Sequence, residues 1–184
     1  MSYQLPLPGL SMPPVPAPAF AAMSTALADL HRFPAVQSEA LQVHGKAIGL
    51  AAEHLIDSLL IRRGETVLSA PESEHFDRVL LRDSRSVKIQ IKARARDRGG
   101  RYTFRVARGF HGSASGSKDY IPGDFDIIAL AALDMNAVYF TAERRKYYSL
   151  TSRQFRGLAC SPYESLDAAL LTLGLVPPGD AACG

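Results

Sequence analysis

The chain has 184 residues, of which 47% are hydrophobic and 21% are charged, and its formal net charge is +3 at pH 7. This length and composition predict one folded globular domain with a hydrophobic core, and they exclude a fibrous or fully disordered protein. The longest apolar run, Ile127 to Leu133, is far shorter than the roughly 20 residues of a membrane-spanning helix, and the N-terminus lacks a signal-peptide pattern. We therefore expect a cytoplasmic protein with no membrane partner.

The positive charge is concentrated in one part of the sequence. Residues 75–120 contain twelve Lys or Arg residues and four Asp or Glu residues, so the rest of the chain carries a net charge of about −5. A local excess of cationic side chains favours a polyanionic partner, because these side chains bind phosphates and displace condensed counterions. The alternative is a solvated basic face of a sheet that has no partner.

The N-terminal segment differs in composition from the rest of the chain. Residues 1–36 are rich in Pro and Ala, and seven of the twelve prolines lie in this segment. Because proline disfavours helix interiors and central strands, we expect a flexible tail here. Residues 37–176 carry the periodic apolar patterns and form the expected domain, and residues 177–184 are expected to be a flexible C-terminus.

The first element expected in the domain is a long helix. Apolar residues recur at helical spacing from residue 37 to residue 63, and Gly64 provides a stop. A closing helix is expected over residues 164–173. Strand patterns cover residues 66–68, 76–82, 87–96, 101–108, 126–133 and 137–141, with a Gly- and Ser-rich loop at 109–118. This mixture of elements predicts a single α/β domain.

Two of these strands form a predicted hairpin. We expect a tight turn in which Asp83 lies opposite Ser86. This register places Asp77 directly across from Lys92, with Gln90 across from the residue two positions after Asp77. Since side chains alternate between the two faces of a strand, the side chains of Asp77, Gln90 and Lys92 then share one face of the sheet.

These side chains are suited to phosphodiester hydrolysis by a hard divalent ion. Asp77 offers a carboxylate oxygen, Gln90 an amide oxygen and Ile91 a backbone carbonyl, which are the ligand types that Mg²⁺ prefers. Lys92 supplies a cation that steadies the attacking water and the developing negative charge. The alternative interpretation is a half-buried strand with a solvated basic face.

Glu53 is a further acidic candidate on the long helix. On a helical projection it lies at the margin of the apolar stripe, where an unpaired carboxylate would be costly to desolvate. Glu53 therefore needs a partner. That partner is either a lysine or arginine, which makes the role structural, or a metal ion held jointly with Asp77.

The order of these residues resembles the pattern of a known nuclease family. A helix with Glu53, then Gly64, a strand with Asp77 in FDRVLLR, and Gln90-Ile91-Lys92 are similar to the PD-(D/E)XK nuclease superfamily. The QIK form resembles its branch of intron-encoded homing endonucleases, and the resemblance covers about residues 45–141. Most members have Asp or Glu at the Gln90 position, so the amide removes one negative charge and should weaken Mg²⁺ binding.

The resemblance implies a fold, a reaction and a set of roles. The fold is a restriction-endonuclease-like mixed central sheet flanked by helices. The implied catalytic residues are Glu53, Asp77, Gln90 and Lys92. Asp77 and Gln90 are implied as metal ligands, Glu53 has a supporting acidic role beside its candidacy as a third ligand, and Lys92 activates or positions water. The implied activity is that of a DNA endonuclease with Mg²⁺ as cofactor and Mn²⁺ as the alternative ion.

The basic residues that follow Lys92 are expected to hold the phosphates of DNA. They are Arg94, Arg96, Arg98, Arg101, Arg105, Arg108 and Lys118. A homo-oligomer is expected if both strands are cut, because such nucleases commonly act as symmetric assemblies. Two other functions stay open, namely a catalytically inactive nucleic-acid-binding module of the same fold and a module whose basic sheet binds an acidic protein. Tyr102, Tyr120, Tyr147 and Tyr148 either stack on bases or pack internally.

Overall fold

The computed structural model describes residues 29–82, 85–109 and 116–175. The expected N-terminal tail lies mostly outside these ranges and the expected flexible C-terminus entirely so. None of the helices in the described ranges has both the length and the apolar content needed to cross a membrane. The predicted turn residues Asp83 and Ser84, and much of the predicted 109–118 loop, also lie outside the described residues.

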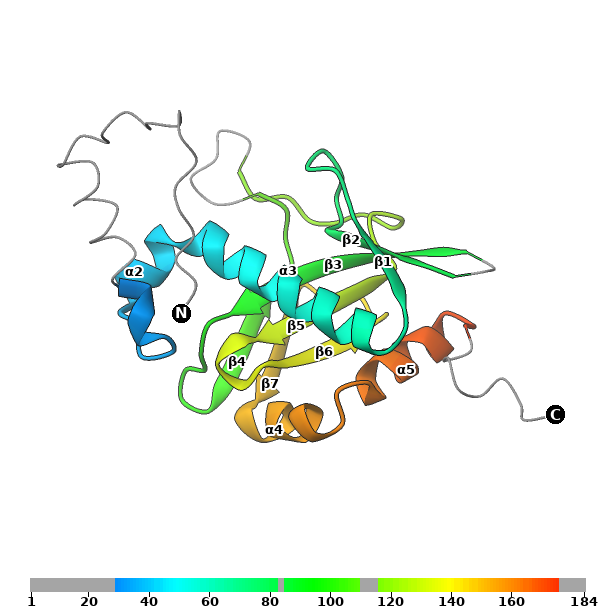
Figure 1. The fold of residues 1–184 in the computed structure, drawn as a ribbon. Coiled ribbons are helices and arrows are strands. Elements are labelled where there is room, and N and C mark those ends of the chain that lie inside the picture. Colours follow the sequence, from blue (N-terminus) through cyan, green and yellow to red (C-terminus); the bar gives the residue numbers. More distant parts are fainter. Residues whose placement is uncertain (1–28, 83–84, 110–115, 176–184) are drawn as a thin grey trace, which may run out of the picture.

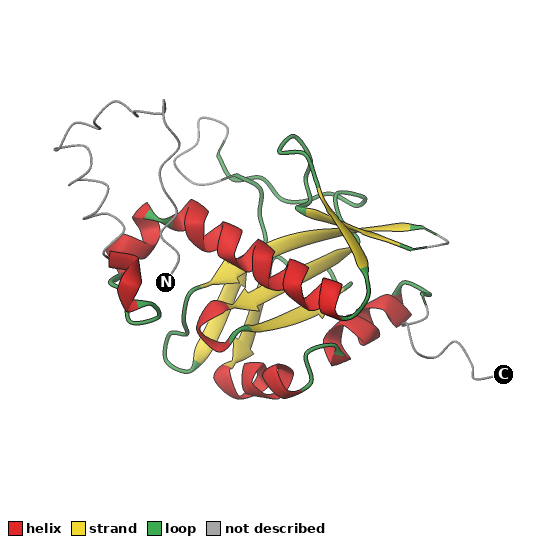
Figure 2. Ribbon diagram, viewed as in Figure 1, coloured by secondary structure: helices red, strands yellow, loops and turns green. Residues whose placement is uncertain are grey.

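The described residues form a mixed five-stranded sheet in the order β1-β2-β3-β5-β6. Its strands are β1 (Thr66–Ser69), β2 (Arg78–Leu81), β3 (Ser86–Arg94), β5 (Ile127–Ala132) and β6 (Ala137–Thr141). β3 and β5 run parallel, and the other neighbours are antiparallel. A separate antiparallel pair joins β4 (Arg101–Arg105) to β7 (Tyr147–Thr151). The predicted α/β fold with a mixed central sheet flanked by helices is confirmed (Figure 2).

The predicted N-terminal helix is divided in two at His44. The parts are α2 (Ser38–Val43) and α3 (Gly45–Arg62), and a short 3₁₀ turn, η1 (Asp29–Arg32), precedes them. Gly64 ends α3 as predicted, because its φ of 84° lets the N–H of Glu65 reach the carbonyl of Leu60 at 3.0 Å. The predicted closing helix is α5 (Glu164–Thr172), and a second short 3₁₀ turn, η2 (Leu133–Met135), lies between β5 and β6.

Two hydrophobic clusters pack on opposite faces of the central sheet. On one face, Ile89 of β3 packs in a cluster with Ile56 of α3 and Leu170 of α5. On the other face, Ile128 of β5 packs in a cluster with Phe104 of β4 and residues of β7 and α4. All residues of β5 are buried, which agrees with its unbroken apolar run. Figure 1 shows α3 running across the first face, with β4 and β7 beyond the sheet.

Two C-terminal elements were not predicted from the sequence. They are β7 and the helix α4 (Ser152–Cys160) that follows it directly. The start of α4 carries a capping box, in which the Thr151 side chain accepts from the N–H of Gln154 and the Gln154 side chain accepts from the N–H of Thr151. Thr-x-x-Gln is a recognisable helix start in a sequence, so this signal was present.

The predicted register of the β2–β3 hairpin is wrong by two residues. Leu81 pairs with Ser86 and Val79 pairs with Lys88. The N–H of Asp77 donates to the carbonyl of Ile89 at 2.9 Å, so Asp77 lies level with Gln90 and not with Lys92. A shift of two residues keeps every side chain on its predicted face, because side chains alternate with a period of two.

Candidate active site

Asp77 lies immediately before β2, on the sheet face that points away from α3. Its Oδ2 accepts the Gln90 Nε2 donor at 2.6 Å and the N–H of Ile91 at 2.7 Å. Within the described residues, its other oxygen, Oδ1, has no hydrogen-bond partner. Burial raises the pKa of Asp77 above its ordinary value, although the Ile91 N–H and the charge of Lys92 oppose this effect. The neighbouring donors and cations therefore compensate only part of the cost of burying the Asp77 carboxylate.

Gln90 is buried beneath this carboxylate, with 5% of its surface exposed. Its Nε2 donates to Asp77 Oδ2 and, at 3.1 Å, to the carbonyl of Ile91. The amide nitrogen thus lies between two of the oxygens that the sequence predicts as metal ligands. These two donor bonds are the ones that a side-chain amide can make and a carboxylate cannot.

Lys92 extends from β3 on the same face and contacts Tyr120. Its Nζ donates to the Tyr120 hydroxyl at 3.1 Å and lies 5.3 Å from the centre of the ring. Tyr120 is in turn packed edge-on against Phe125, with ring centres 5.1 Å apart. Burial lowers the pKa of Lys92, and the charge of Asp77 partly offsets this. Sequence reasoning left the role of Tyr120 open, and the structure shows it against the predicted catalytic lysine.

These side chains line one hollow, which we call the Asp77 hollow. It has a volume of about 500 Å³, and its lining includes Asp77, Gln90, Lys92, Tyr120, Arg108 and Lys118. Arg108 lies 3.8 Å from the Asp124 carboxylate and 5.9 Å from the Tyr120 ring centre. The structure therefore brings three of the predicted catalytic residues together with two of the predicted phosphate-binding residues.

Glu53 approaches this site from α3 but is bound to an arginine. Its carboxylate lies 3.0 Å from Arg78 Nη1, and the same guanidinium binds Asp57 at 2.6 and 2.9 Å. Arg78 Nη1 also donates to the Asp77 carbonyl at 2.8 Å. The charge of Glu53 is close enough to contribute to the raised pKa of Asp77. Of the two partners considered for Glu53, the structure shows the arginine, and metal binding by Glu53 stays a prediction.

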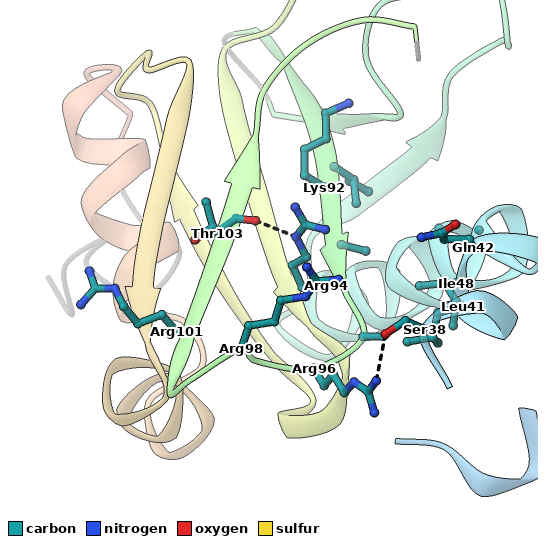
Figure 3. Close-up of a pocket in the computed structure, with 15 residues that line it drawn as sticks. Ser38, Leu41, Gln42, Ile48, Lys92, Arg94, Arg96, Arg98, Arg101 and Thr103 are labelled. Carbon is teal, nitrogen blue, oxygen red and sulfur yellow. Dashed lines mark hydrogen bonds between the residues drawn. The ribbon is translucent and has the colours of Figure 1, made fainter. Parts of the chain in front are cut away.

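Four of the other predicted DNA-binding arginines line a second hollow, which we call the arginine groove. They are Arg94, Arg96, Arg98 and Arg101. The groove has a volume of about 730 Å³ and runs between the β3–β4 segment and the α2–α3 helices (Figure 3). Lys92 lines both hollows. Arg105 is exposed on β4 and lines neither of them.

Comparison with known proteins identifies the family. The sequence model of the PD-(D/E)XK endonuclease family matches residues 43–155, which is more than half of the chain. The chain belongs to the PD-(D/E)XK endonuclease family. This confirms the resemblance predicted over residues 45–141. A comparison with curated proteins gave no match.

A solved structure supports the same fold for this PD-(D/E)XK chain. It is that of a bacterial homing endonuclease, I-Ssp6803I, with a TM-score of 0.50 and 17% sequence identity. The similarity covers 58% of this chain and 77% of the homing endonuclease. At this level of identity the comparison establishes the shared fold alone.

PD-(D/E)XK nucleases generally use divalent metal ions, and the donor set of the Asp77 hollow fits such an ion. Asp77 presents a carboxylate oxygen without a described partner, and the carbonyl of Ile91 accepts from the same Gln90 Nε2 that donates to the other Asp77 oxygen. Both are hard oxygen donors of the type that Mg²⁺ and Mn²⁺ bind. The part of the chain that the structure describes contains no group of three or more His, Cys, Asp and Glu side chains that could hold a metal ion.

Proposed function

We propose that this chain is a Mg²⁺-dependent DNA endonuclease that hydrolyses phosphodiester bonds, with Mn²⁺ as an alternative ion. The observation that carries the proposal is the Asp77 hollow. There a partly unpaired carboxylate, a backbone carbonyl and a side-chain amide lie beside a lysine with no described carboxylate within 4.0 Å. A metal-dependent phosphodiesterase requires oxygen ligands and a nearby cation in this combination.

In this proposal, Asp77, the Ile91 carbonyl and the Gln90 amide oxygen hold the ion. When bound, the ion supplies Lewis-acid chemistry at the scissile phosphate. Gln90 would present its amide oxygen to the ion in the alternative orientation of the amide, with Oε1 in the place of Nε2 between Asp77 and Ile91.

Lys92 acts on the other side of the reacting phosphate. Its ammonium group stabilises the negative charge that develops in the transition state and positions the attacking water. Tyr120 holds the ammonium in place through its hydroxyl and ring. Burial lowers the pKa of Lys92, so that the group gives up a proton more readily than an exposed lysine does. We assign Glu53 a supporting role through Arg78, which joins it to the backbone at Asp77.

The second candidate function is a DNA-binding module without catalysis. The observation that favours it is the Gln90 amide, whose Nε2 donates to both the Asp77 carboxylate and the Ile91 carbonyl. In such a module the amide is a permanent structural link. The basic residues around the two hollows then serve binding alone. A third candidate, an acidic protein partner for the basic sheet, is separated from both by the response of DNA binding to salt.

The deciding experiment is cleavage of plasmid and oligonucleotide DNA with Mg²⁺, Mn²⁺ or EDTA. We expect cleavage with either ion and none with EDTA. Asp77→Ala should abolish both metal binding and cleavage while DNA binding is largely kept. Glu164→Ala is a matched control, because it removes an exposed carboxylate in the first turn of α5, outside the hollow. Metal affinity and DNA affinity that are both unchanged by Asp77→Ala, with no cleavage by the native chain, would support the inactive module.

A further inference from the structure

The arginine groove contains basic side chains that have no acidic partners. Among the described residues, none of Arg94, Arg96, Arg98 and Arg101 lies within 4.0 Å of a carboxylate, whereas Arg63, Arg78 and Arg108 elsewhere each form an ion pair. Arg94 is fixed by donating from Nε to the Thr103 carbonyl at 2.6 Å, and Arg96 donates to Ser38 Oγ at 3.3 Å. These bonds orient the guanidinium groups without neutralising them.

The arginines also repel one another. Burial lowers the pKa of Arg94, and the charge of Arg98 lowers it further. Figure 3 shows the side chains of Arg94, Arg96 and Arg98 projecting between β4 and the α2–α3 helices. Like charges held in one groove without counterions cost free energy in the free protein, and a polyanion relieves that cost.

The opposite wall of the groove is formed by helical residues, and two of them are glycines. Gly45 and Gly49 line the groove one turn apart on α3. Glycine destabilises a helix relative to alanine, so its use here needs a reason. A Cβ at either position would meet no atom within 4 Å, and neither glycine has a positive φ, so neither a clash of the Cβ nor a left-handed backbone explains these glycines. A ligand that packs closely against this helix face explains the two glycines, because a side chain there would occupy the space of the ligand.

We propose that the arginine groove binds the sugar–phosphate backbone of one DNA strand, which continues past Lys92 into the Asp77 hollow. The groove volume of about 730 Å³ lies in the range of roughly 300–1,000 Å³ that holds a small ligand. The groove therefore has room for a short stretch of the backbone of one strand. The guanidinium groups bind phosphates on one side, and the glycine wall contacts the sugars on the other. This proposal rests on the proposed nuclease function, because it leads the strand to Lys92.

The first test measures DNA affinity against salt concentration, with the full chain, a labelled duplex with a single-stranded extension, and EDTA to prevent cleavage. Arg98→Ala should reduce the slope of log affinity against log salt by about one, which is the loss of one phosphate contact. Arg153→Ala is the matched control, because Arg153 is exposed on α4 and does not line the groove. Equal slopes for native protein and Arg98→Ala would overturn the proposal.

The second test concerns the glycine wall. Gly49→Leu should fill the space that the strand occupies and displace the strand from the arginines opposite. The phosphate contacts that are lost in this way should lower DNA affinity by about tenfold or more. Gly157→Leu is the matched control, because Gly157 is also helical, a Cβ added there would meet no atom within 4 Å, and it does not line the groove. Native affinity in a folded Gly49→Leu protein would overturn the proposal.

A measurement on the unaltered protein covers the case in which Gly49→Leu does not fold. Phenylglyoxal modifies accessible arginines, so DNA should protect Arg98 and leave Arg153 reactive. Equal reactivity with and without DNA would overturn the proposal. So would competition by polyglutamate as strong as that by DNA, because it would assign the groove to an acidic protein.

The two proposals can fail separately. If the native chain cleaves DNA with Mg²⁺ and the groove variants bind and cleave like it, the groove proposal fails and the nuclease stands. If the groove variants lose DNA binding while the native chain cleaves no DNA, the groove stands as a binding site and the nuclease proposal fails.

Discussion

Replacement of Gln90 by Glu tests the proposed metal site through stability, independently of cleavage. The Gln90 amide donates to the Asp77 carboxylate at 2.6 Å and to the Ile91 carbonyl at 3.1 Å. A hydrogen bond to a charged group contributes about 1.5–3 kcal/mol, and Glu cannot donate either bond when ionised. Two carboxylates about 4 Å apart repel by about 4 kcal/mol at an effective dielectric constant of about 20.

These terms predict a large loss of stability in the metal-free Gln90→Glu protein. Near neutral pH we expect a loss of about 3–5 kcal/mol, because the coupled pair keeps part of one proton and this limits the repulsion. For a chain of this size the loss lowers Tm by about 10 °C. The deficit should shrink as the pH falls, since one carboxyl group then becomes protonated and donates to the other.

The assay is thermal unfolding in EDTA and in increasing Mg²⁺. Binding of Mg²⁺ to the folded state should raise the Tm of Gln90→Glu far more than that of the native protein, because the ion neutralises the added charge. Gln90→Ala should respond to Mg²⁺ less than the native protein does. Ser86→Glu is the charge control, since it adds a carboxylate at an exposed position of β3 outside the Asp77 hollow. An equal Mg²⁺-dependent rise in Tm for Gln90→Glu and native protein would refute the assignment of Gln90 as a ligand.

Three further predictions follow from the pKa directions and contacts of the site. The pKa of Asp77 is raised in the folded state, so the ionised Asp77 side chain lowers the stability of the protein at high pH. Asp77→Asn should therefore raise Tm in EDTA at pH 8. This rise in Tm should vanish as the pH falls through the pKa of Asp77 in the folded state. Lys92→Ala should leave Mg²⁺ affinity in a calorimetric titration unchanged or slightly higher and lower the cleavage rate by orders of magnitude; a rate near that of the native protein would contradict the catalytic role. Tyr120→Phe keeps the aromatic ring but removes the hydroxyl that accepts from the charged Lys92. The pKa of Lys92 should then fall further, so the decrease in cleavage rate at high pH should begin at a lower pH. An unchanged dependence of the cleavage rate on pH would limit Tyr120 to packing.

The sequence alone was sufficient for features that depend on local periodicity. The 3.6-residue spacing located the helix that ends before Gly64, and the two-residue alternation located most strands of the central sheet. The same alternation placed Asp77, Gln90 and Lys92 on one face. That result survived the error in the β2–β3 register, because a shift of two residues leaves the faces unchanged.

The tertiary structure decided the features that depend on contacts between distant segments. Periodicity shows that Glu53 needs a partner but not that Arg78, 25 positions later, provides it. The bond between Lys92 and Tyr120 spans 28 positions, and the arginine groove joins α2 and α3 to the segment after β3. Such contacts arise when the burial of two hydrophobic clusters forces the elements together, and the free energy of that packing is distributed over the whole chain rather than encoded in any local pattern.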